Sequence, residues 1–184
     1  MAKNAIFTVR FRRKREGKTN YKKRLELLKS GLNRLVIRRT NTSIVIQLVS
    51  YEPDGDKVLL TFSSNKLGSF GWNYSKKSLP AAYLAGLVAG KKAVDAGFKE
   101  AILDLGLQSP LKGSKLYAAL KGVVDAGLNV PHSDDIFPSE ERITGQHIAN
   151  IGDLASRFTA YQKNKLDVKK LPEVFEATKK KILA

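Results

Sequence analysis

The chain has 184 residues, and its 33 Lys and Arg against 17 Asp and Glu give a formal net charge of +16. There is no cysteine, which excludes disulfides, cysteine-based zinc sites and catalysis by a thiol. The longest apolar run, residues 79–90, is shorter than the roughly 20 residues of a membrane-spanning helix, and no secretory signal pattern opens the chain. We therefore expect one cytoplasmic domain with extensions and no membrane partner.

The first predicted element is an extended basic tail, residues 1–20. Residues 1–40 carry fourteen Lys or Arg and two acids, a net charge of +12, whereas residues 41–112 and 113–184 carry +2 each. Within residues 10–24, Phe11 and Tyr21 stand among nine cations and a single acid. Such cations displace the counterions of a nucleic acid, and aromatic rings stack on exposed bases. The tail therefore predicts RNA binding.

Residues 21–127 predict an α/β domain around a mixed sheet. A helix is expected over residues 21–30, with Thr19 or Asn20 as its N-cap and Gly31 after its end. The β-branched runs 34–38, 44–49 and 57–62 predict a three-stranded antiparallel meander, and residues 66–77 predict a loop. A helix over 78–96 leads to a strand over 99–105, which this crossover makes parallel to a meander strand. A second helix is expected over 114–126, ending at Gly127.

Residues 128–184 predict a C-terminal extension. Two prolines and the acidic pairs at 134–135 and 140–141 indicate a loop-like excursion, followed by a short helix over 147–156. A terminal helix is expected over 171–184, with Leu171, Val174, Phe175 and Ile182 on one side.

Alternation along the first strand places Arg34, Val36 and Arg38 on one face of the sheet. Together with Arg39 and the tail, these side chains predict a continuous basic surface that favours RNA. The alternative is a set of solvated charges on an edge strand, which deter aggregation.

Other side chains could carry chemistry. Asp54, Asp56 and Asp104 could hold magnesium in a nucleic-acid-processing enzyme, although aspartates in turns usually serve the turn itself. His132 and His147 lack the spacing of a metal pair. Residues 112–115 precede a helix and could bind an anion or form an ordinary loop. A general DNA-compacting protein is a third functional class for so basic a chain.

Four blocks resemble a known family. The run Phe11-Arg-Arg-Lys-Arg-Glu-Gly-Lys-Thr-Asn-Tyr21-Lys-Lys-Arg24 resembles the start of the universal large-subunit ribosomal protein eighteen family, in its archaeal and eukaryotic branch. Residues 34–41, 79–87, and 127–135 with 142–147 agree with the same family, in the same order. Residues 65–72 and 160–184 do not carry the resemblance.

The resemblance implies a non-catalytic ribosomal protein with an α/β fold, without metal, cofactor or small-molecule substrate. It implies binding to 5S rRNA, attachment of that RNA to the large-subunit rRNA in the central protuberance, and neighbouring ribosomal proteins as partners. The residues expected at RNA are Arg10, Arg12, Arg13, Lys14, Arg15, Lys18, Thr19, Tyr21, Lys22, Arg24, Arg34, Arg38, Arg39, Asn41, Gly145 and His147.

Overall fold

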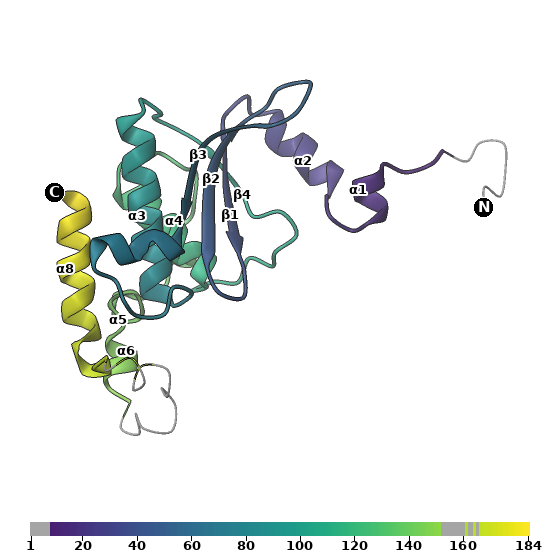
Figure 1. The fold of residues 1–184 in the computed structure, drawn as a ribbon. Coiled ribbons are helices and arrows are strands. Elements are labelled where there is room, and N and C mark those ends of the chain that lie inside the picture. Colours follow the sequence, from purple (N-terminus) through teal and green to yellow (C-terminus); the bar gives the residue numbers. More distant parts are fainter. Residues whose placement is uncertain (1–7, 152–160, 162–163, 165) are drawn as a thin grey trace.

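A four-stranded mixed sheet, in the order β3-β2-β1-β4, forms the centre of the α/β fold (Figure 1). This computed structural model describes residues 8–151, 161, 164 and 166–184. The predicted meander is confirmed as β1 (Arg34–Arg39), β2 (Ile44–Ser50) and β3 (Lys57–Ser63), each antiparallel to the next.

The fourth strand, β4 (Ile102–Asp104), pairs in parallel with β1, as predicted for a strand reached through a helix. It is shorter than the predicted run 99–105. The backbone before it pairs with the chain that follows the next helix: Ala101 N–H donates to Asn129 O, and Asn129 N–H donates to Lys99 O, both at 3.0 Å. The first half of the run therefore lies outside the ladder with β1.

Two helices cover one face of the sheet, and a third lies outside them (Figure 1). The central pair is α3 (Leu79–Asp95) and α4 (Lys115–Asp125), and both predicted spans are confirmed. Ser78 caps α3 by accepting a hydrogen bond from the Ala81 N–H. A Cβ on Gly86 would lie 2.0 Å from Ala119 O, so glycine permits the close approach of the two helices.

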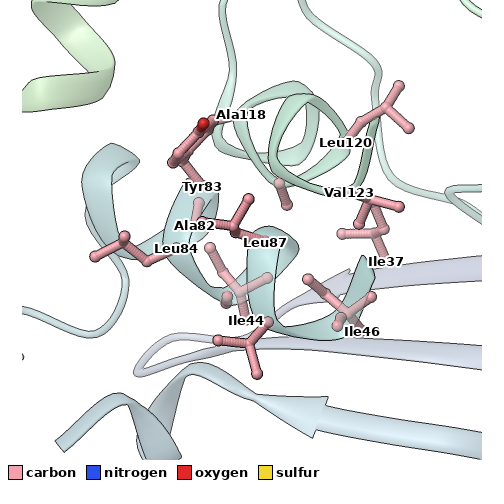
Figure 2. Packing of buried hydrophobic residues seen from close by; sticks show 14 of the residues in the cluster. Ile37, Ile44, Ile46, Ala82, Tyr83, Leu84, Leu87, Ala118, Leu120 and Val123 are labelled. Atoms are coloured by element: carbon pink, nitrogen blue, oxygen red, sulfur yellow. The ribbon is translucent and has the colours of Figure 1, made fainter. Parts of the chain in front are cut away.

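The core lies between this helix pair and the inward face of the sheet (Figure 2). Ile37 and Ile46 project from the strands, Leu87 from α3, and Leu120 and Val123 from α4. All five side chains are fully buried or nearly so. The alternation predicted for β1 is correct, because Ile37 enters the core while Val36 faces the opposite side, where it lines a groove.

The segment after β3 differs from the predicted loop. A 3₁₀ helix, η1 (Ser64–Phe70), precedes Gly71, whose φ of 93° ends it, and Trp72 is completely buried. The Ser64 hydroxyl accepts from the Ile44 N–H and donates to Lys76 O, so this polar group is satisfied inside the core. A run of Gly, Ser and aromatic residues thus packs as part of the body.

The C-terminal extension contains η2 (Asp134–Ile136), α5 (Glu140–Thr144), α6 (Gln146–Ala149), η3 (Val168–Lys170) and α8 (Leu171–Leu183). The helix predicted over 147–156 is shorter within the described residues, because α6 ends at Ala149, and 152–156 lie outside them. The terminal helix is confirmed. Leu171, Phe175 and Ile182 are buried in the same core as α3.

The N-terminal region carries two helices that extend away from the sheet (Figure 1). The helix predicted over residues 21–30 is α2 (Tyr21–Leu28). Asn20 caps it, because its side chain accepts a hydrogen bond from the Lys23 N–H. The tail prediction is incomplete, because α1 (Arg12–Arg15) forms one helical turn within it. Neither helix has a buried residue.

Candidate nucleic-acid interface

Residues 10–24 form a strongly cationic, accessible surface, which we call the N-terminal basic segment. It holds nine Lys or Arg and one acid, and none of its residues is buried. That acid, Glu16, lies 2.9 Å from Lys18 Nζ and 3.6 Å from Arg12 Nε. One carboxylate cannot compensate nine cations, so the segment presents a large positive excess to whatever lies beside it.

Local contacts fold this segment back on itself. The rings of Phe11 and Tyr21 lie 5.0 Å apart, on either side of α1 in the chain. Arg13 Nε donates to Thr19 Oγ1 at 2.8 Å, and Gly17 turns the backbone with a φ of 64°. The segment is therefore a compact loop with its cations on the outside, and Thr19 and Tyr21 help to shape it.

Five charged side chains join α2 to the sheet, and we call them the arginine–aspartate cluster: Arg24, Arg34, Arg38, Asp56 and Asp104. Arg24 donates to both Asp56 oxygens at 2.7 Å. Arg34 Nη2 lies 2.6 Å from the Asp56 carboxylate as an ion pair without hydrogen-bond geometry, while its Nη1 donates to Asp104 at 3.0 Å. Arg38 donates to the Asp104 carboxylate at 3.2 Å and to its backbone oxygen at 2.6 Å.

The charges in this cluster stabilise one another. The hydrogen bonds from Arg24 lower the pKa of Asp56 to about 2; burial opposes this shift, and Arg34 adds to it. The same contact raises the pKa of Arg24. The cluster thus fixes α2, and with it the N-terminal basic segment, to the turn between β2 and β3 and to the end of β1.

Arg34 occupies a different environment from the one the sequence suggests. Its side chain is 4% exposed, and both of its partners are carboxylates. It does lie on the same sheet face as Val36 and Arg38, as predicted, but it sits behind Arg24 and Asp56. A guanidinium enclosed in this way orients its neighbours and has no free donor surface for a phosphate.

A groove of about 570 Å³ separates the N-terminal basic segment and α2 from the open face of the sheet. Six of its lining residues are cationic, and the two acidic ones, Asp56 and Asp104, are the carboxylates already paired with arginine. Val36, Val49 and Val58 form its apolar floor. The groove is therefore positively charged and open, which suits a polyanion better than a small apolar ligand.

Arg39 is the last residue of β1, and Asn41 lies in the turn between β1 and β2. Both are exposed. The Arg39 N–H donates to Gln108 Oε1, and Gln108 Nε2 donates to Ile37 O, so this glutamine holds the end of β1. Sequence reasoning missed Gln108, because nothing in the sequence indicates that its loop returns to β1.

Gly145 joins α5 to α6, and His147 lies in α6. These helices lie beside α8, far from α2 (Figure 1), and neither residue lines the groove. Gly145 has a φ of 85°, and a Cβ there would lie 2.2 Å from Leu171 Cδ2. His147 is half-buried, with its Nδ1 3.2 Å from Glu141 O. The glycine is thus required by packing, and neither residue joins the N-terminal basic segment in one surface.

The magnesium alternative requires unpaired carboxylates that converge on one point, and Asp54, Asp56 and Asp104 do not meet this requirement. Asp56 and Asp104 do converge, but the group between them is the Arg34 guanidinium, with which both form ion pairs. Asp54 does not belong to the arginine–aspartate cluster. Within residues 8–151 and the described part of 161–184, no three His, Cys, Asp or Glu side chains gather closely enough to hold a metal ion. The helices described there also include none with the length and apolarity needed to cross a membrane.

Comparison with known proteins matches the chain to proteins of the large ribosomal subunit. The model of a family described as "Ribosomal large subunit proteins 60S L5, and 50S L18" matches residues 5–99 and 95–133. The chain is also 48% identical over 191 aligned residues to the large ribosomal subunit protein uL18 of Korarchaeum cryptofilum (strain OPF8). That alignment covers 100% of this chain and 98% of the archaeal protein, so it includes the stretches that carry no motif of their own.

Proposed function

Because the chain belongs to the family of ribosomal large subunit proteins 60S L5 and 50S L18, and is thus a structural protein of the large ribosomal subunit, we propose that it binds 5S rRNA. In this proposal it attaches the 5S rRNA to the large-subunit rRNA in the central protuberance, beside neighbouring ribosomal proteins. The N-terminal basic segment provides the main RNA contact, and the α/β body is the scaffold that positions it.

The observation that supports this proposal most is the charge of an accessible segment that the body holds in place. Nine cations and one acid lie within residues 10–24, and none of these side chains is buried. A single turn such as α1, with four cations and no packed face, gains little stability from its own backbone. Neighbouring phosphates would offset the repulsion between its side chains, so an RNA is the partner that best explains this geometry.

The residues divide into contacts and supports. We assign direct phosphate contacts to the exposed cations of the segment: Arg10, Arg12, Arg13, Lys14, Arg15, Lys18 and Lys22. Phe11 and Tyr21 offer rings to exposed bases. Arg24 and Arg34 position the segment through Asp56, and Arg38 and the exposed Arg39 and Asn41 extend the basic surface along β1.

The same proposal divides the chain by role. Residues 1–20 are the RNA-binding tail, residues 21–127 the α/β domain, and residues 128–184 a C-terminal extension whose helix α8 packs against α3. Gly145 and His147 serve the packing of that extension, so we expect their substitution to act on stability before RNA affinity.

The salt dependence of binding tests the proposal. If about 6–10 phosphates are engaged, affinity for 5S rRNA should fall roughly 10³–10⁵-fold between 50 and 200 mM salt. Replacing Arg10, Arg12, Arg13, Lys14 and Arg15 with glutamine should reduce the magnitude of the log–log salt slope by up to about 4, since each lost phosphate contact contributes about 0.7–0.9.

A matched control removes the same number of charges elsewhere. Lys66, Lys99, Lys169, Lys170 and Lys180 are all exposed and lie outside the segment, so their joint replacement with glutamine should leave the slope nearly unchanged. Equal effects of the two variants would contradict the proposal. Duplex DNA bound as tightly as 5S rRNA would instead indicate a general polyanion-binding protein.

A further inference from the structure

A second hollow lies at the far end of the sheet from α2. It has a volume of about 340 Å³ and is lined by Arg39, Thr40, Asn41, Ile44, Lys77 and Lys115. Three cations that are distant in the sequence come together here: Arg39 at the end of β1, Lys77 just before the Ser78 cap of α3, and Lys115 as the first residue of α4. The sequence gives no sign that Lys77 and Lys115 meet.

The positive charges in this hollow form no ion pair with any residue that the structure describes. Within the described part of the chain, no carboxylate pairs with Arg39, Lys77 or Lys115. Nearby Lys112, by contrast, is paired with Asp135. Burial lowers the pKa of Lys115, and the charges of Lys77 and Arg39 lower it further.

This arrangement is unfavourable for the free protein. Three like charges repel one another, and both α3 and α4 begin here, so the positive ends of their dipoles add to the same potential. The Thr40 hydroxyl is already used, because it donates to Ser43 O and accepts from the Ser43 N–H. The Asn41 residue is exposed. The hollow thus offers guanidinium, ammonium and amide donors around an open space.

We propose that this hollow binds a backbone phosphate of ribosomal RNA, at a point separate from the N-terminal basic segment. Arg39 supplies a planar fork for phosphate oxygens, and Lys77 and Lys115 supply compact charges beside it. β1 has six residues between the two ends, a span of about 17 Å at roughly 3.3 Å per step. The protein therefore holds RNA at both ends of its sheet.

The inference uses the chain's place in the large ribosomal subunit, which surrounds it with rRNA, and does not depend on which RNA the N-terminal basic segment binds. A carboxylate-rich protein segment would satisfy the same charges, and the experiment below separates it from RNA. Arg39 and Asn41 belong to the surface already proposed, and the new elements are Lys77, Lys115 and the separate site.

A tethered cleavage probe tests this inference in reconstituted large subunits. Because the chain has no cysteine, Thr42→Cys carries a single iron–EDTA probe beside the hollow and leaves its lining residues intact, and exposed Val9→Cys places a second probe near the N-terminal basic segment. We expect the probe at residue 42 to cut rRNA at nucleotides that the probe at residue 9 does not cut.

The outcomes separate the two proposals. No rRNA cleavage from residue 42 above that of untethered probe, in subunits where residue 9 gives cleavage, overturns the second site and leaves the 5S rRNA proposal standing. Cleavage from residue 42 together with no cut in 5S rRNA from residue 9 supports the second site and contradicts the 5S rRNA proposal.

A charge variant distinguishes a binding role from a structural one. The double substitution Lys77→Ala and Lys115→Ala should weaken binding to the rRNA segment identified by the probe by about tenfold or more. It should leave the Tm of the free protein unchanged or raised, because it removes repulsion. The control Lys99→Ala with Lys180→Ala removes two exposed charges elsewhere and should leave that affinity nearly unchanged. A lowered Tm with unchanged affinity would show that the two lysines serve the fold and would overturn the inference.

Discussion

Replacing Asp56 with asparagine removes the charge that joins Arg24 on α2 to Arg34 on β1. Arg24 would lose both of its 2.7 Å hydrogen bonds to a carboxylate. Arg34, with a side chain only 4% exposed, would keep Asp104 as its one remaining carboxylate partner. The size of the side chain hardly changes, so the variant isolates the electrostatic part of this link.

The expected loss of stability at neutral pH is about 1–3 kcal/mol. A pKa lowered from 3.8 to about 2 corresponds to at most about 2–3 kcal/mol of folding free energy. Because Asp56 is partly exposed, solvent screening reduces this contribution to about 1 kcal/mol. The less satisfied charge of buried Arg34 adds about 1 kcal/mol or more.

The pH dependence has a definite sign. The folded-state pKa of Asp56 lies below its unfolded value, so its stabilisation is fully present above about pH 4 and disappears as the pH falls towards 2. Denaturant unfolding should therefore show a difference between wild type and Asp56→Asn at pH 7 that shrinks at pH 3 and closes only below about pH 2.

RNA affinity distinguishes general charge attraction from binding by a positioned segment, because the two predict opposite effects of Asp56→Asn. The substitution raises the net charge by one, so general attraction to a polyanion would strengthen binding, whereas loss of the positioned segment would weaken it. We expect weaker binding to 5S rRNA in a filter-binding assay. The control is Glu52→Gln, an exposed acid 3.7 Å from Lys57, which should change stability by less than about 0.5 kcal/mol. Unchanged stability and stronger RNA binding in Asp56→Asn would refute the reasoning.

Two further substitutions test the core and the tail. Gly86→Ala places a Cβ 2.0 Å from Ala119 O and should destabilise the fold by about 1–3 kcal/mol or more. The control Gly68→Ala, which has open space around the new Cβ, should not destabilise the fold. Chemical denaturation measures both variants, and equal stability of the two would contradict the close approach of α3 and α4. Phe11→Ala removes the ring pair with Tyr21, whose centroids lie 5.0 Å apart and whose contact is worth about 0.5–1.5 kcal/mol. It should weaken 5S rRNA binding about 2- to 10-fold and leave the Tm unchanged. A lowered Tm would show instead that the ring pair stabilises the body.

Local patterns predicted the elements of the body well. β-branched runs located β1, β2 and β3 within one residue at each end, because strand preference and alternation agreed there. Ser78 and Gly127 marked helix ends through cap chemistry that needs no tertiary information. The parallel direction of β4 followed from the topology of the crossover, whereas its pairing with β1 in particular did not.

Features that depend on long-range contacts were not predictable. Asp56 and Asp104 were candidate metal ligands, because the sequence does not show that both meet Arg34 across the sheet. For the same reason Arg34 looked accessible, and Lys77 and Lys115 had no apparent relation. Gly145 matched a family block, yet its place against Leu171 became evident only with α8 packed in position.

A structure of the native large subunit tests the central claim most directly. In a cryo-EM map of the particle, the account predicts that residues 10–24 lie against 5S rRNA, with cationic side chains at its phosphates and the α/β body behind them. A map in which that segment extends into solvent, away from any RNA, would contradict it.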